Sequence, residues 1–186
     1  IYEGTSEIME MTIGRDRWQE HLKSRGAFYH DLGADLEKLA LAQPNVGATA
    51  AALAHHAFAE MMEIARVQRL TRNQHVLFRL GELAATVECA GALARRAAAA
   101  ERGELPDKAD TRFDAEQLAA VSRVFAREAA AKAAYDGLRW VMGASAPGAV
   151  DAAALENAMA LREIEQAQSG LIADMDAVAD ALYGRG

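Results

Sequence analysis

Residues 48–100 read ATAAALAHHAFAEMMEIARVQRLTRNQHVLFRLGELAATVECAGALARRAAAA, and this stretch decides the fold. Apolar side chains recur at three- and four-residue spacings on both sides of Asn73, which is the pattern of amphipathic helices. The expected core positions are Leu53, Ala57, Met61, Ile64 and Leu70 before this break, and Val76, Leu77, Leu80, Leu83, Ala84, Val87 and Gly91 after it. We therefore predict helices over residues 48–71 and 74–100, packed as an antiparallel pair in which the glycines permit close backbone approach.

Two shorter helices are predicted before this pair, over residues 6–24 and 27–42. The loop at residues 43–47 separates them from the pair, because it carries Pro, Asn and Gly within four residues. The first helix has a charged side that includes Arg17, which we expect to be solvated. Its apolar side is expected to hold Ile8, Met11, Trp18 and Leu22.

The second half of the chain predicts two more long helices after a polar connection at residues 101–113. Asp114 has Gln117 three residues later, the spacing of a capping box, and an apolar stripe continues from there to Met142. Asp151 is expected to cap a single last helix with a heptad-like stripe, which favours bundle packing. That stripe consists of Leu161, Ile164, Leu171, Met175, Val178 and Leu182.

The fold class that follows is all-α. Alanine is abundant, only three prolines occur, and no run of alternating β-branched residues indicates a strand. Each predicted helix has one apolar stripe to bury, and packing the helices together buries all of them. We expect an antiparallel helical bundle of long helices, preceded by a short helical N-terminal segment.

Composition and charge argue against several classes of protein, among them nucleic-acid-binding and membrane-spanning proteins. The 186 residues carry a formal net charge of −7, which argues against a nucleic-acid partner. No apolar run approaches the ~20 residues of a transmembrane helix. Cys89 has no second cysteine to pair with, and its neighbours predict a small buried hydrophobe. Nothing in the sequence indicates secretion, so we expect a cytoplasmic protein.

The first eight residues, IYEGTSEI, carry the specific functional signal. Glu3 lies beside Gly4, a residue that lets the backbone turn sharply or approach a ligand closely. Thr5 or Ser6 can cap the following helix, and Glu7 falls in its first turn, where negative charge is favoured. The pattern therefore predicts a carboxylate on a short loop at a rigid helix end, which is a suitable position for a general base.

This octapeptide resembles the segment near the C-terminal end of acyl-CoA dehydrogenases, the flavoenzymes that oxidise acyl-CoA to trans-2-enoyl-CoA in fatty-acid β-oxidation. The resemblance implies that Glu3 is the catalytic base, that Thr5 contacts FAD, and that Glu7 lies near the cofactor. It also implies acyl-CoA as the substrate and the electron-transfer flavoprotein as a partner. Most of the flavin site would come from sequence upstream of Ile1, so we expect the isolated chain to be inactive.

A weaker resemblance extends over residues 58–97, which look like the extra C-terminal domain of very-long-chain acyl-CoA dehydrogenases and their bacterial relatives. It implies that residues 1–25 end the flavin domain and that residues 26–186 form an added helical domain. Such a domain is associated with homo-oligomer formation, and a peripheral membrane contact stays open. The alternative is a non-catalytic helical module for protein interaction, with the octapeptide a chance resemblance.

No metal site is predicted. Neighbouring residues on a helix point about 100° apart, so His55 and His56 do not easily bind one ion. No histidine has a glutamate three residues before it, as a di-iron helix bundle requires. Met61 and Met62 are expected in the core. The arginines at 66, 69, 72, 95 and 96 are expected mainly on solvated helix ends and faces, with an anionic membrane or the CoA phosphates as the alternative contact.

Overall fold

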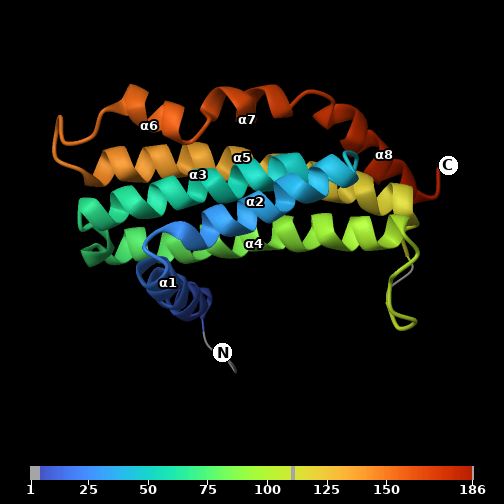
Figure 1. Cartoon of the computed structure of the whole chain (residues 1–186), viewed down its shortest axis with the longest axis horizontal. Helices are drawn as coiled ribbons and strands as arrows, with labels where there is room; N and C mark the ends of the chain where they lie inside the picture. Colours follow the sequence, from blue (N-terminus) through green and yellow to red (C-terminus); the bar gives the residue numbers. More distant parts are fainter. Residues whose placement is uncertain (1–4, 110–111, 186) are drawn as a thin grey trace.

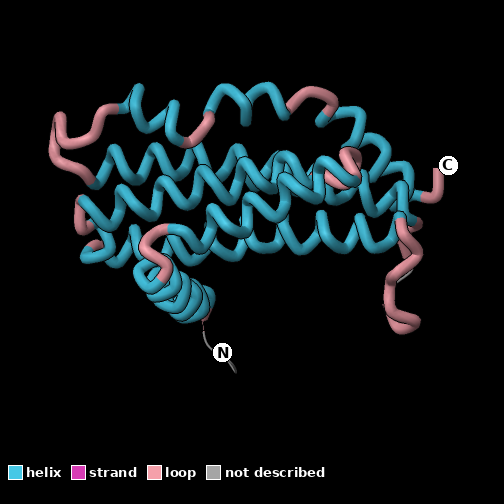
Figure 2. Tube along the Cα trace, viewed as in Figure 1, coloured by secondary structure: helices cyan, strands magenta, loops and turns pink. Residues whose placement is uncertain are grey.

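The computed structural model describes residues 5–109 and 112–185, and within them the all-α prediction is confirmed, with no strand (Figures 1 and 2). The elements follow in the order α1 (Ser6–Lys23), α2 (Ala27–Ala42), α3 (Ala48–Val67), the 3-10 turn η1 (Leu70–Arg72), α4 (Gln74–Glu101), α5 (Ala115–Ala144), α6 (Ala152–Ala158), α7 (Leu161–Ala167) and α8 (Leu171–Tyr183).

The long helices α3, α4 and α5 lie side by side, each running opposite to the one before it (Figure 1). Helix α2 packs along α3, and α1 lies outside this set against α4. The interior between the long helices is lined largely by alanine, with Phe58, Met61 and Leu83 among the larger buried side chains. Small side chains let the axes of these helices approach closely. The closely packed helices form the support against which α1 lies.

Local sequence signals set several helix starts. The Asn73 side chain accepts a hydrogen bond from the backbone N–H of His75 at 3.0 Å, which begins α4. The capping box predicted at the start of α5 is confirmed. Asp114 accepts from the backbone N–H of Gln117 at 2.9 Å, and the Gln117 side chain accepts from the backbone N–H of Asp114 at 3.1 Å. Side chains thus satisfy backbone donors that no helical carbonyl can reach.

The predicted helix over residues 48–71 ends earlier, at Val67. Arg69 adopts a left-handed conformation with φ 56°, so the backbone leaves the helical path before the 3-10 turn that follows. Arginines crowd this end, and Arg66 donates to Glu63 at 2.8 and 2.5 Å.

The single last helix predicted after Asp151 is wrong, because the structure divides it into α6, α7 and α8. The breaks lie at Ala160 (φ 52°) and at Gly170 (φ 82°). Leu155, Met159 and Ile164 are all buried. In an unbroken helix the five-residue step from Met159 to Ile164 would turn the second side chain about 140° away from the first. The break at Ala160 brings both onto the buried side.

One prediction of burial is also wrong. Cys89 is exposed. On α1, Ile8 and Leu22 are 50% and 47% exposed, whereas Gly14 and His21 are buried. The contact face of α1 is therefore rotated away from the predicted apolar stripe, since the closest approach to α4 is made through a glycine.

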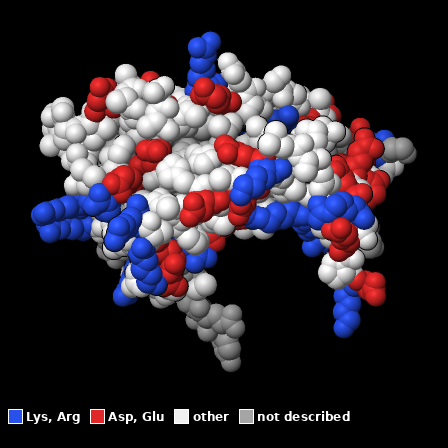
Figure 3. Space-filling view, viewed as in Figure 1, with Lys and Arg blue, Asp and Glu red and all other residues white. Residues whose placement is uncertain are grey.

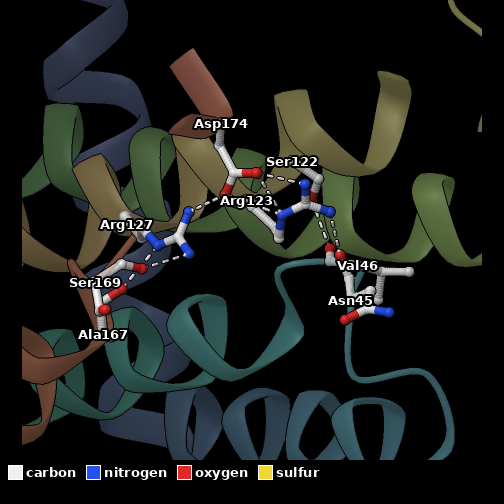
Figure 4. A network of polar contacts seen from close by, with 8 residues as sticks. All are labelled: Asn45, Val46, Ser122, Arg123, Arg127, Ala167, Ser169 and Asp174. Carbon is white, nitrogen blue, oxygen red and sulfur yellow. Dashed lines mark hydrogen bonds and ion pairs between the residues drawn. The ribbon is translucent and has the colours of Figure 1, made fainter. Parts of the chain in front are cut away.

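Helix α8 has no fully buried residue and is held by charge (Figure 4). Asp174 accepts hydrogen bonds from Arg123, the shortest at 2.5 Å, and from Arg127. Both arginines also donate to backbone carbonyls, Arg123 to Asn45 in the loop before α3 at 2.9 Å and Arg127 to Ala167 at the end of α7 at 2.7 Å. Asp174 and its two arginines thus join α5 and α8 to the end of α7 and to the loop before α3.

We expect Asp174→Asn to lower the free energy of unfolding by about 1.5–3 kcal/mol, the range for hydrogen bonds to charged groups. The hydrogen bond from Arg123, then that from Arg127, lowers the pKa of Asp174. Its stabilisation is therefore complete above the pKa of an unfolded aspartate and is lost as the pH falls through the lowered folded pKa. Urea unfolding from pH 7 to pH 2 measures this, with Asp176→Asn on the exposed side of α8 as control. Equal effects of the two substitutions would contradict the role of Asp174.

Candidate functional site at the start of the first helix

The described part of the octapeptide forms the N-terminus of α1. Thr5 is the N-cap, with extended backbone (φ −83°, ψ 162°), and its hydroxyl oxygen accepts from the backbone N–H of Ile8 at 3.4 Å. Glu7 is exposed in the first turn, and a backbone N–H, followed by the Thr5 hydroxyl, lowers its pKa. Glu3 lies outside the described residues. The structure therefore brings Thr5 and Glu7 together at the helix end where anions are favoured.

The helix that carries this site crosses α4 with backbone against backbone. A Cβ atom on Gly81 would lie 1.9 Å from the carbonyl oxygen of Glu10, and one on Gly14 would lie 2.7 Å from the carbonyl oxygen of Leu77. Both glycines are buried. A close backbone approach at the glycines of α4 was predicted for the packing of α4 on α3. At Gly81 the approach is present, but the neighbouring helix is α1.

Ion pairs hold α1 on either side of this crossing. Toward its N-terminus, Arg79 of α4 lies 3.0 Å from Glu10. One turn beyond the glycine, Arg17 donates to both oxygens of Glu88, at 2.5 and 2.8 Å. The bond with Glu88 raises the pKa of Arg17. Arg17 keeps 35% of its side chain exposed, but the prediction of a merely solvated residue missed its pairing with Glu88 of α4.

Glu88 also accepts from the Tyr29 hydroxyl at 2.8 Å. Tyr29 is fully buried, and burial, followed by the charge of Glu88, raises the pKa of its hydroxyl far above the ordinary value. The phenol is therefore a permanent donor that orients the carboxylate toward Arg17. The sequence does not indicate this network, since residues 17, 29 and 88 lie far apart in the chain and carry no local signal that joins them.

The outer side of α1 continues the site as a partly apolar surface. Ile8, Met9 and Leu22 are 50%, 53% and 47% exposed. In the view of Figure 3, Lys and Arg side chains are interspersed with Asp and Glu and do not form one uniform patch. The start of α1 thus offers a hydroxyl, a carboxylate and apolar side chains on a rigid mount, which can contact a ligand with both polar and apolar parts.

Other candidate residues take structural positions. Met61 and Met62 are buried, as predicted. His55 is also buried, and its Nδ1 lies 2.7 Å from the carbonyl oxygen of Ala51. Within residues 5–109 and 112–185, no group of three or more His, Cys, Asp or Glu side chains is arranged to hold a metal ion. None of the helices in those ranges combines the length and apolar character that a membrane crossing needs.

Comparison with known proteins finds no match for this chain among protein-family models, curated proteins or solved structures. The assignment of a function therefore depends on the residues themselves. Of the predicted site residues, Thr5 and Glu7 lie at one described location, and the polar and glycine contacts above fix the helix that carries them.

Proposed function

We propose that this chain is the C-terminal part of an FAD-dependent acyl-CoA dehydrogenase that oxidises acyl-CoA to trans-2-enoyl-CoA. The observation that carries the proposal is the sequence IYEGTSEI at the start of α1, with Thr5 as the N-cap of that helix. The octapeptide resembles the family's segment for the catalytic base. The N-cap supports this reading, because the helix begins directly after Thr5, one of the two residues of the octapeptide expected to cap it.

In this proposal Glu3 accepts the α-proton of the acyl thioester. The bound FAD would supply the acceptor for the hydride that leaves the β-carbon, and the electron-transfer flavoprotein would receive the electrons. Thr5 and Glu7 fit a contact with a polar edge of the cofactor, because they present a hydroxyl and a carboxylate at an exposed helix N-terminus. Two residues do not hold a dinucleotide, so the rest of its site would come from preceding sequence.

The remaining helices serve in this proposal as an added domain, residues 26–186, that supports homo-oligomer formation in the cytoplasm. Residues 1–25 end the flavin domain. The exposed apolar residues of α1 support this division, because Ile8, Met9 and Leu22 would be covered once the preceding domain is in place.

A non-catalytic helical interaction module is the second candidate, and α8 favours it. Ile172, Leu182 and Tyr183 are 67%, 59% and 73% exposed on that helix. An apolar side far from α1 can bind a partner protein without any flavin chemistry. The two proposals differ in one property, which is flavin in the intact protein.

We expect the full natural polypeptide that contains these residues to purify with about one FAD per chain and to be bleached by acyl-CoA without oxygen. Residues 1–186 alone should bind no FAD, because Thr5 and Glu7 are too few contacts. The visible absorbance of both proteins, prepared in parallel, measures this. A colourless full-length protein that also fails to bind added FAD would favour the interaction module. Stoichiometric flavin in residues 1–186 alone would contradict the proposed division of the site.

A further inference from the structure

Two histidines meet between α2 and α3, away from the start of α1. His30 and His56 are stacked, with ring centroids 5.2 Å apart and planes inclined by 29°. Their Nδ1 atoms lie 2.9 Å apart. The sequence places His56 beside His55 and four residues before Glu60, but no local signal pairs it with a residue 26 positions earlier. Both side chains reach solvent, with 41% and 25% exposure.

Each ring has a carboxylate at its other nitrogen. Nε2 of His30 lies 3.4 Å from Glu60, and Nε2 of His56 lies 3.4 Å from Glu37. A carboxylate beside the outer nitrogen of an imidazole favours the hydrogen on that nitrogen and leaves the other free as a ligand. Metal-binding histidines have this arrangement, in which the outer partner fixes the tautomer and ring orientation.

A glycine makes room for the pair. A Cβ atom on Gly33 of α2 would lie 2.6 Å from Nε2 of His56 and 2.7 Å from its Cε1. Any larger residue at position 33 would displace the imidazole from its place beside His30. Both the orientation of the rings and the space for them are therefore set by residues that do not belong to the candidate flavin site.

We propose that His30 and His56 form a binding site for a divalent transition-metal ion of the Cu²⁺ or Ni²⁺ class, with both Nδ1 atoms as ligands and water completing the coordination. Two nitrogens about 2.05 Å from an ion and about 90° apart lie about 2.9 Å from each other, whereas tetrahedral ligands lie about 3.3 Å apart. The 2.9 Å hydrogen-bond separation of the two Nδ1 atoms is therefore also compatible with neighbouring positions of a tetragonal site, which Cu²⁺ and Ni²⁺ prefer, so an ion can replace the hydrogen between them without separating the rings.

Binding requires both Nδ1 atoms to be free of hydrogen. Without an ion the two Nδ1 atoms lie at hydrogen-bond distance, which places one hydrogen between them. With an ion, each imidazole carries its hydrogen on Nε2, facing Glu60 or Glu37, and the hydrogen between the Nδ1 atoms is displaced to Nε2 of its own ring or to solvent. The ion links α2 to α3, and this role does not depend on the proposed dehydrogenase activity.

The test is isothermal titration of tag-free, full-length protein with NiCl₂ or CuCl₂. The number of bound ions should fall by one per chain in His30→Ala/His56→Ala and stay unchanged in His75→Ala, the exposed control on α4. Glu60→Gln, which leaves both ligands in place, should weaken the same site about 10–100-fold. An unchanged stoichiometry in the double variant would overturn the site, and unchanged affinity in Glu60→Gln would overturn the role of the carboxylate.

A spectroscopic measurement separates this site from non-specific binding. The electron paramagnetic resonance spectrum of the Cu²⁺-loaded protein should show coupling to two imidazole nitrogens, and the double variant should lose that signal. A spectrum that is the same in the two proteins would contradict the proposal.

Discussion

Replacing Gly81 with alanine is expected to push α1 off α4 and to destabilise the protein by about 3 kcal/mol or more, the upper end of the range for overpacking. The added Cβ would lie 1.9 Å from the carbonyl oxygen of Glu10, well inside van der Waals contact. A side chain could rotate away, but here the obstacle is backbone, so a whole helix must move. Its movement would also separate Glu10 from Arg79, and Arg17 from Glu88.

Urea unfolding and hydrogen exchange measure the two parts of this effect. The free energy of unfolding should fall, and the amides of α1 should lose protection before those of α3. Gly143→Ala is the matched control, because its added Cβ meets nothing within 4 Å and alanine favours the helix by up to about 1 kcal/mol. If Gly81→Ala proves as stable as Gly143→Ala, with α1 still protected, the close crossing is not present in solution.

Sequence reasoning succeeded where the signal is local. The starts of α4 and α5 follow from Asn73 and from Asp114 with Gln117, because each cap bonds to backbone two or three residues away. The break at Pro44 and Gly47 is equally local, and α3 begins directly after it. These positions need no knowledge of what the helix packs against.

The failures concern contacts between distant segments. Alanine is not a turn-forming residue, so the sequence does not indicate a helix break at Ala160. The break follows from packing, because it brings both Met159 and Ile164 onto the buried side. Arg17 looks solvated in a charged run until Glu88 is placed opposite it. The face of α1 that contacts α4 is likewise set by packing. It is centred on the buried Gly14, whereas Ile8 and Leu22 of the predicted apolar stripe are about half exposed.

In the candidate site, too, the local features could be predicted and the contacts between distant segments could not. The octapeptide contains the predicted site residues Glu3, Thr5 and Glu7. A cap at Thr5 could be predicted, because it bonds to the backbone only three residues away. The contacts that hold α1 on α4 could not be predicted from the sequence, because they join residues far apart in the chain. Gly14 packs against Gly81, and Arg17 pairs with Glu88. Glu3 lies outside the described residues, so its role stays a prediction.

Glu3→Gln is expected to slow the chemical step about 10²–10⁴-fold, the usual contribution of a general base. The amide keeps the size of the side chain and some of its hydrogen bonding, but it does not accept the α-proton. Flavin content and substrate affinity should change little, because most contacts to both would come from preceding sequence. Glu20→Gln is the matched control on α1, where the carboxylate pairs only with Lys23 among the described residues.

The most direct test of the proposed dehydrogenase activity is rapid mixing of the full natural polypeptide, loaded with FAD, with acyl-CoA in the absence of oxygen. The rate of flavin reduction is followed by absorbance in the wild type, Glu3→Gln and Glu20→Gln. We expect Glu20→Gln to match the wild type and Glu3→Gln to reduce its flavin at least about 100-fold more slowly with unchanged flavin content. Reduction of Glu3→Gln at the wild-type rate would show that Glu3 is not the base and would contradict the account.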